Sequence, residues 1–161
     1  MLRRMTSRTP VVLPTITTIP QVRFSDTDAQ GIVYYGRYMP YFDLARVEYL
    51  RHLGLLRSDL GPRQFVMRAF AVEYDAPAVF DDLIEVFVRL ARFGRTSATY
   101  EYAAHRFPDG ELMVTATQTV VLIDPATRRP LPVTDELRAP VRAFEGDALL
   151  GPVLKRLPEA T

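Results

Sequence analysis

The stretch VRFSDTDAQGIVYYGRYMPYFDLARVEYLRHLGL, Val22–Leu55, decides the fold of this chain. Its opening residues have the character of a short strand, and the hexad DTDAQG at 26–31 is rich in turn-forming residues. From Tyr38 onward, apolar side chains recur at helical spacing, at positions 38, 41, 42, 45, 49 and 53. With Gly54 as a natural stop, the spacing predicts one helix of about four turns over 38–53, apolar enough on one side to need a sheet beneath it.

Most of the remaining sequence is predicted to form strands. Four segments alternate apolar and polar side chains with a period of two, the pattern of strands that have one face on a core. These segments are 65–74, 83–91, 96–107 and 114–122. The connectors between them are short and rich in turn formers, which favours antiparallel neighbours. The sequence therefore predicts an α+β fold in which a curved antiparallel sheet of five or six strands wraps around one long helix.

A single domain is expected, because the 161 residues are 48% apolar and show neither an internal repeat nor a second core pattern. Residues 1–19 carry several prolines and no acidic residue, and they are predicted to form an extended N-terminal arm. The domain is expected over 20–138 and a C-terminal tail over 139–161. A short helix over 134–144 also fits the sequence, with Pro140 as the objection to it.

The composition excludes several classes of site. The chain has no cysteine, so it forms no disulfide, thiolate zinc site or iron–sulfur cluster, and a reducing cytoplasm is the simpler expectation for its location. Its formal net charge of +1 provides no extended field for nucleic acid, and no apolar run approaches the roughly 18 residues of a membrane span. No serine lies in a G-x-S-x-G frame, which argues against a Ser–His–acid hydrolase.

The hexad DTDAQG is the candidate site, because it concentrates two carboxylates between a strand and a helix. The spacing D-x-D-x-x-G also opens a calcium loop of the EF-hand type. The twelfth position of that loop requires a bidentate Glu, and here it is Arg37, so we do not expect calcium. A plain turn is the other alternative, with Gly31 supplying a positive φ, and the spacing alone favours it.

The segment IVYYGRY, 32–38, favours a catalytic site over a plain turn. It places apolar and aromatic residues directly after the carboxylates and leads into the helix N-terminus. A carboxylate beside unpaired backbone N–H donors suits acyl transfer, since the donors stabilise oxyanion charge while the carboxylate attacks or activates water. Thioesters are electrophilic enough to react at a site made only of a carboxylate and backbone N–H donors. No metal or redox cofactor is expected, because the sequence offers no cluster of ligands.

In residues and spacing, Val22–Leu55 resembles the signature of the 4-hydroxybenzoyl-CoA thioesterase family and its relatives, the small acyl-CoA thioesterases of the Tol–Pal-linked type, which have the hotdog fold. The shared features are two aspartates one residue apart, a glycine three residues after the second, IVYY, and an aromatic-rich start of the helix. VEYDAPAVFDDLIEV (72–86), DGEL (109–112) and VVLIDPATRRPLP (120–132) also resemble the family. The resemblance covers 20–138 and implies a hotdog domain.

The resemblance also implies the site residues. The catalytic carboxylate of the family falls on Asp28, whose role as nucleophile or as general base stays open. Tyr35 takes the position at which a backbone N–H faces the thioester carbonyl. Gly31 lets the chain turn closely past the substrate, and Val33 and Tyr34 are expected to contact it.

Other binding residues are expected further along the chain. Thr96 and Ser97 begin a predicted strand and are expected to form hydrogen bonds with the pantetheine arm of coenzyme A. Arg128 and Arg129 lie in a proline-flanked loop and are expected to meet its phosphates, the alternative being two solvated loop charges. Asp43 departs from the family, which usually carries Glu there. Because another hotdog branch places its acid on the helix, Asp43 is a reserve catalytic candidate.

The expected activity is hydrolysis of acyl-CoA thioesters, with no nucleic acid and no membrane insertion. A noncatalytic acyl-CoA-binding or assembly protein of the same fold stays open as an alternative, as does a thioesterase for acyl-carrier protein. A sheet with one helix on one face leaves its other face and its edges uncovered. We therefore expect a homodimer or, as in hotdog relatives, a homotetramer, with the active site at the subunit boundary.

Overall fold

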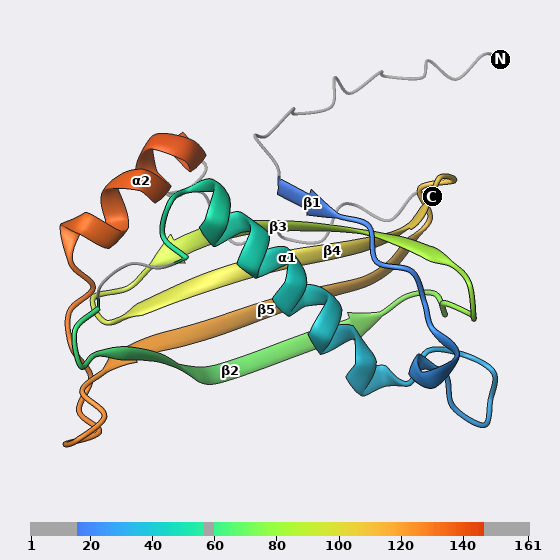
Figure 1. The fold of residues 1–161 in the computed structure, drawn as a ribbon, viewed down its shortest axis with the longest axis horizontal. Coiled ribbons are helices and arrows are strands. Elements are labelled where there is room, and N and C mark those ends of the chain that lie inside the picture. The colour runs from blue at the N-terminus through green and yellow to red at the C-terminus, as the bar shows by residue number, and fades with distance from the viewer. Residues whose placement is uncertain (1–15, 57–59, 147–161) are drawn as a thin grey trace, which may run out of the picture.

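The computed structural model describes residues 16–56 and 60–146, drawn in colour in Figure 1. The predicted helix and all four predicted strands are present, with bounds that differ from the expected ones by no more than a few residues. In chain order the elements are β1 (Ile16–Thr18), the 3-10 turns η1 (Phe24–Asp26) and η2 (Tyr35–Arg37), α1 (Tyr38–His52), β2 (Gln64–Tyr74), β3 (Leu83–Phe93), β4 (Ser97–Phe107), β5 (Leu112–Ile123) and α2 (Asp135–Glu145).

The strands form one antiparallel sheet of five, in the order β1-β3-β4-β5-β2. The long strands β3, β4 and β5 follow one another as hairpins, whereas β2 returns to pair with β5 at the far edge. Figure 1 shows α1 lying diagonally across one face of the curved sheet. This is the α+β hotdog architecture that the sequence predicted.

The core lies between α1 and the sheet. On α1, Ala45 and Tyr49 are fully buried, and the ring of Phe42 lies 4.8 Å from that of Tyr102 on β4. Burying each large apolar side chain of this kind contributes about 1.5–3 kcal/mol. The hydroxyl of Tyr102 donates a hydrogen bond of 2.5 Å to Gln118 on β5, which satisfies two buried polar groups. The alternating pattern of the strands therefore serves to cover one helix.

Both ends of the expected domain carry additional packed structure. β1 pairs with β3, although the sequence assigned residues up to 19 to an arm. The predicted boundary at 138 falls inside α2, and Val141 is buried against the core. The rest of the predicted arm, 1–15, and the tail from 147 onward lie outside the described residues. No helix among residues 16–56 and 60–146 has the length and apolar character needed to cross a lipid bilayer.

Candidate active site

The loop that carries the two aspartates is anchored by the first of them. Asp26 is buried, and its Oδ2 accepts hydrogen bonds from the Tyr41 hydroxyl at 2.8 Å and from the Arg23 backbone N–H at 2.9 Å. Its own carbonyl accepts a bond from the Tyr34 N–H at 2.9 Å. Burial, followed by the contact with Asp26, raises the pKa of Tyr41 well above its usual range, so the phenol stays a donor. Asp26 thereby ties the loop to α1.

Asp28 lies in the turn that follows, and its contacts and burial differ from those of Asp26. Its N–H donates to the Ile32 carbonyl at 2.9 Å, and its Oδ1 accepts a bond from the Gln30 N–H at 2.8 Å. Gly31 closes the turn onto the Asp28 carbonyl with a φ of +76°, a conformation that favours glycine, as the sequence predicted. The Asp28 side chain is half-buried, in contrast to that of Asp26, and its Oδ2 accepts no hydrogen bond from any described residue.

Tyr35 begins the helical run that leads into α1. The first N–H groups of a helix have no partner within it, and the Tyr35 N–H donates to no other residue in the described part of the chain. The partial positive charge of the helix start lies at this amide. The Tyr74 hydroxyl on β2 donates to the Tyr35 carbonyl at 3.0 Å, which holds the peptide unit that directly follows this amide.

Exposed aromatic side chains lie around the loop: Tyr34 and Tyr35, which the sequence singled out, and Phe24 and Phe80, which it did not. The rings of Tyr34 and Tyr35 are 4.2 Å apart, and those of Phe24 and Phe80 meet edge to face at 6.1 Å. Phe24 is 80% exposed. The side-chain hydrogen bond with Tyr35 raises the pKa of Tyr34, and the Asp28 charge adds to this effect. An exposed apolar cluster of this kind marks a site for a ligand or a partner.

Val33 differs from the expectation of a substrate contact. Its side chain is buried in the core, with 4% exposed, because its N–H pairs with the Ala78 carbonyl at 2.8 Å and a bridge joins Thr27 to Val33. Its contribution is to hold the loop against the sheet.

The segments that carry the other expected binding residues, the loop between β3 and β4 and the turn after β5, lie at the opposite end of the sheet (Figure 1). Ser97 pairs with Val121 near the start of β2, whereas the loop of Asp28 is bridged to the sheet at Val79, beyond the end of β2. Eleven residues of β2 separate the two ends, a span of roughly 30 Å. The structure does not bring Asp28 together with these residues, which are Thr96, Ser97, Arg128 and Arg129, in one chain.

Arg128 and Arg129 lie in the turn after β5. The Arg128 N–H donates to the Asp124 carbonyl at 2.7 Å, and Arg128 has a φ of +57°. Both arginines are exposed, and neither forms an ion pair within the residues that the structure describes. Thr96 lies at the same end, since its carbonyl accepts a bond from Leu122 at 2.9 Å.

Asp43 and the two histidines have other contacts. Asp43 is exposed on α1 and forms an ion pair of 3.1 Å with Arg46. His52 lies against the ring of Phe144, and His105 shares a hydrogen bond of 3.0 Å with the Gly110 carbonyl. Of the two candidate catalytic acids, Asp28 and Asp43, Asp28 is the one that lies in the loop preceding the unpaired Tyr35 amide, and it stays the predicted catalytic carboxylate.

Comparison with known proteins identifies the family of this chain. The Thioesterase-like superfamily matches residues 22–141. The acyl-CoA thioesterase YbgC of Haemophilus influenzae is 32% identical over 123 residues, covering 74% of this chain and 88% of that protein. The acyl-CoA thioester hydrolase YbgC of Escherichia coli O157:H7 is 34% identical over 114 residues, covering 68% and 83%.

Solved structures show the same fold. A thioesterase from Thermus thermophilus, in complex with coenzyme A and zinc, superposes with a TM-score of 0.70 at 29% identity over 83% of this chain and 96% of that chain. The DHNA-CoA thioesterase of Staphylococcus aureus reaches a TM-score of 0.76 at 20% identity over 87% and 97%, which supports the fold. Fold, motif and sequence similarity together place this chain in the Thioesterase-like superfamily, with the hotdog fold.

Proposed function

We propose that the protein hydrolyses acyl-CoA thioesters to a free acid and coenzyme A. The observation that carries this proposal is one segment that holds the half-buried Asp28 carboxylate seven residues before the Tyr35 N–H, an amide at a helix start that has no partner among the described residues. Two curated relatives at 32% and 34% identity are named for this activity. In the proposal the chemistry comes from a carboxylate and a backbone amide, with no metal or redox cofactor.

In this mechanism the thioester oxygen accepts a hydrogen bond from the Tyr35 N–H, which stabilises the negative charge that develops on it. Asp28 then acts in one of two ways. As a nucleophile, its oxygen bonds the acyl carbon, the C–S bond breaks, coenzyme A leaves as thiolate, and water hydrolyses the anhydride. As a general base, it takes the proton of a water that attacks the acyl carbon directly. Both routes need the carboxylate at the same place.

The proposed site extends over two copies of the chain. β2 pairs only with β5 among the described strands, so its other edge is open, and Met67 on it is 52% exposed. Pairing two β2 edges antiparallel about a two-fold axis would set the start of one β2 beside the end of the other. Asp28 of one chain would then face Arg128 and Arg129 of its partner. We therefore propose a homodimer as the smallest active unit.

In such a dimer, the arginines would meet the phosphates of coenzyme A, and Thr96 and Ser97 would lie along the pantetheine arm. The exposed charges of Arg128 and Arg129, which have no acid partner among the described residues, support this role. Light scattering at micromolar concentration tests the assembly. A dimer or a tetramer agrees with the proposal, and a monomer contradicts it.

The activity is tested by release of free thiol from a panel of short aliphatic, long aliphatic and aromatic acyl-CoA thioesters. Turnover of at least one substrate class is expected. Binding of acyl-CoA without turnover would instead indicate a noncatalytic acyl-CoA-binding protein. Acyl-carrier protein substrates form the second arm, and inhibition by free carrier protein that salt relieves would show that the acyl group is presented on that carrier.

A further inference from the structure

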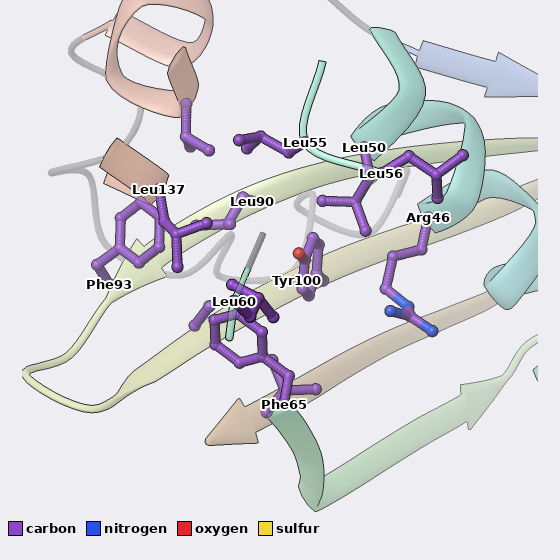
Figure 2. A pocket seen from close by; sticks show the side chains of 13 residues that line it. Arg46, Leu50, Leu55, Leu56, Leu60, Phe65, Leu90, Phe93, Tyr100 and Leu137 are labelled. Carbon is purple, nitrogen blue, oxygen red and sulfur yellow. The ribbon is translucent and has the colours of Figure 1, made fainter. Parts of the chain in front are cut away.

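A cavity of about 150 Å³ lies between the second half of α1, the sheet and α2 (Figure 2). Its walls are mostly apolar and come from α1 and the segment after it, from the strands β2 to β5 and from α2. Among them are Leu50, Leu90, Ala98, Val120, Leu137 and Val141. An enclosed apolar cavity of about 150 Å³ takes up a six-carbon molecule such as benzene, so this partly open pocket has room for a group of that size. The volume and the lining therefore fit an apolar group of about six carbons.

The polar groups at this cavity are hydrogen-bond donors. Figure 2 shows the Arg46 guanidinium beside the cavity and the Tyr100 hydroxyl within it. The Arg46 Nε is buried and has no hydrogen-bond partner. Burial raises the pKa of Tyr100 to about 12, against the smaller opposite effect of the Arg46 charge, so this phenol also stays protonated. The Tyr100 hydroxyl donates to no described residue.

The remaining contacts of Arg46 leave its charge available. Its Nη2 pairs at 3.1 Å with Asp43, whose side chain is 56% exposed, and an exposed pair of this kind is weak. Burial raises the pKa of the neighbouring Tyr102, opposed by the Arg46 charge and by a side-chain hydrogen bond from Arg46, but this neutral phenol leaves the Arg46 charge unbalanced. No acidic side chain lines the cavity within the described residues. A buried donor without an acceptor lowers the stability of the fold, and an anionic oxygen bound beside it would accept its hydrogen bond.

The cavity is separate from the Asp28 loop of the same chain. Arg46 lies eight residues beyond Tyr38 at the helix start, about 12 Å along the axis. The rings of Phe42 and Tyr102 fill the space under α1 between them. A thioester held at the Tyr35 amide and a ligand in this cavity would therefore occupy different places.

We propose that this cavity is a second site that binds a free monocarboxylate of about six carbons, with its chain among the leucines and its carboxylate on Arg46 and Tyr100. Such an acid belongs to the product class of the reaction proposed above, and that link rests on the proposed function. The binding itself needs no turnover. Occupancy would also bridge α1 and α2, since both line the cavity.

Isothermal titration with hexanoate tests the site on the full-length protein. Wild type is expected to bind, Arg46→Gln to bind at least tenfold more weakly, and Ala98→Leu, which fills the cavity, to lose binding. Arg51→Gln is the matched control, because Arg51 is an exposed arginine on the same helix, and it should bind as wild type does. Hexan-1-ol should bind wild type more weakly than hexanoate does.

Several outcomes would overturn the site: no hexanoate binding to wild type, binding that survives Ala98→Leu, or equal affinity in Arg46→Gln and wild type. Should Ala98→Leu fail to fold, Leu50→Phe fills the same space from α1. Asp28→Asn separates the two proposals, because it should abolish turnover and leave hexanoate binding unchanged. Hexanoate binding to a wild-type protein without thioesterase activity would refute the proposed function alone.

Discussion

The two ends of the sheet are built in different ways. At the end that carries Asp28, the turn itself is held by bonds between residues within about twenty positions, as of Asp26 with Tyr41 and of Gly31 with Asp28, and Tyr74 then joins it to β2. At the opposite end, distant segments meet: Arg138 on α2 donates to the carbonyl of Gly94 at 2.6 Å. The turn at the first end can therefore be organised by a contiguous motif before it packs on the rest of the fold, whereas the second end has no such local motif.

This difference has a consequence for catalysis. In the proposed mechanism, the end with Asp28 supplies a carboxylate and an oxyanion donor, and the other end supplies charges suited to phosphates. Since one chain holds them roughly 30 Å apart, we assign chemistry to one end and substrate affinity to the other end of the partner chain. Substitution of Asp28 should therefore lower kcat, whereas substitution of the arginines should raise KM.

Asp28→Asn should have the largest effect. We expect kcat to fall by roughly two to four orders of magnitude, the scale of lost acid–base or nucleophilic assistance, with an unchanged melting temperature. Steady-state thiol release and thermal unfolding provide the two measurements. Asp43→Asn is the control and should retain near-normal turnover. If Asp43→Asn abolishes activity while Asp28→Asn retains it, the acid lies on the helix and the assignment is wrong.

Tyr41→Phe probes the anchoring of the same end. Removing this hydroxyl leaves the buried Asp26 carboxylate with one donor fewer, and we expect a loss of about 1–3 kcal/mol in the free energy of unfolding. Urea denaturation measures it. A smaller fall in kcat than that of Asp28→Asn should accompany the loss, because the loop is less well held. Unchanged stability would show that Asp26 does not anchor the loop.

The double substitution Arg128→Gln and Arg129→Gln tests the other end. Phosphate contacts far from the carbonyl act equally on ground and transition states, so KM should rise roughly three- to tenfold and kcat should stay nearly constant. The kinetics are best measured at low salt, where exposed charges act most strongly. An unchanged KM would show that both residues are solvated loop charges and do not bind the phosphates.

Glu145 should give the smallest effect. Burial raises the pKa of this carboxyl from its ordinary 4.5, opposed by hydrogen bonds from Tyr49 at 2.6 Å and the Leu90 N–H at 3.1 Å. A raised folded-state pKa contributes stability that is present below the unfolded pKa and lost as pH rises through the folded one. Glu145→Gln should therefore gain stability relative to wild type as pH rises above about 4.5. Parallel pH profiles in denaturant titrations would contradict this.

The sequence predicted the fold well because the fold depends on local patterns. The alternation at Ile84, Val86, Val88 and Leu90 and the helical spacing from Tyr38 each indicate one buried face, and all these positions are buried except Leu53, which is partly buried. The positive φ of Gly31 was predictable for the same reason, since a tight turn after two aspartates requires it.

Other features depend on contacts that no local pattern reports. That β2 pairs with β5 at the edge, and so separates Arg128 from Asp28, follows from long-range strand order. The exposed surface of Phe24 and Phe80 joins residues 56 positions apart. The cavity beside Arg46 depends on how side chains of different sizes meet, and α2 continues past the expected boundary because Val141 packs on the core.

The most direct measurement of the two-chain site is complementation in mixed oligomers. Asp28→Asn chains and chains carrying Arg128→Gln with Arg129→Gln are co-expressed in equal amounts and assayed at acyl-CoA concentrations below KM. If Asp28 acts with the arginines of its partner, half of the dimers are hybrids with one intact site each, and kcat/KM should recover to about a quarter of wild type. Activity no higher than the mean of the two separate variants would contradict the account.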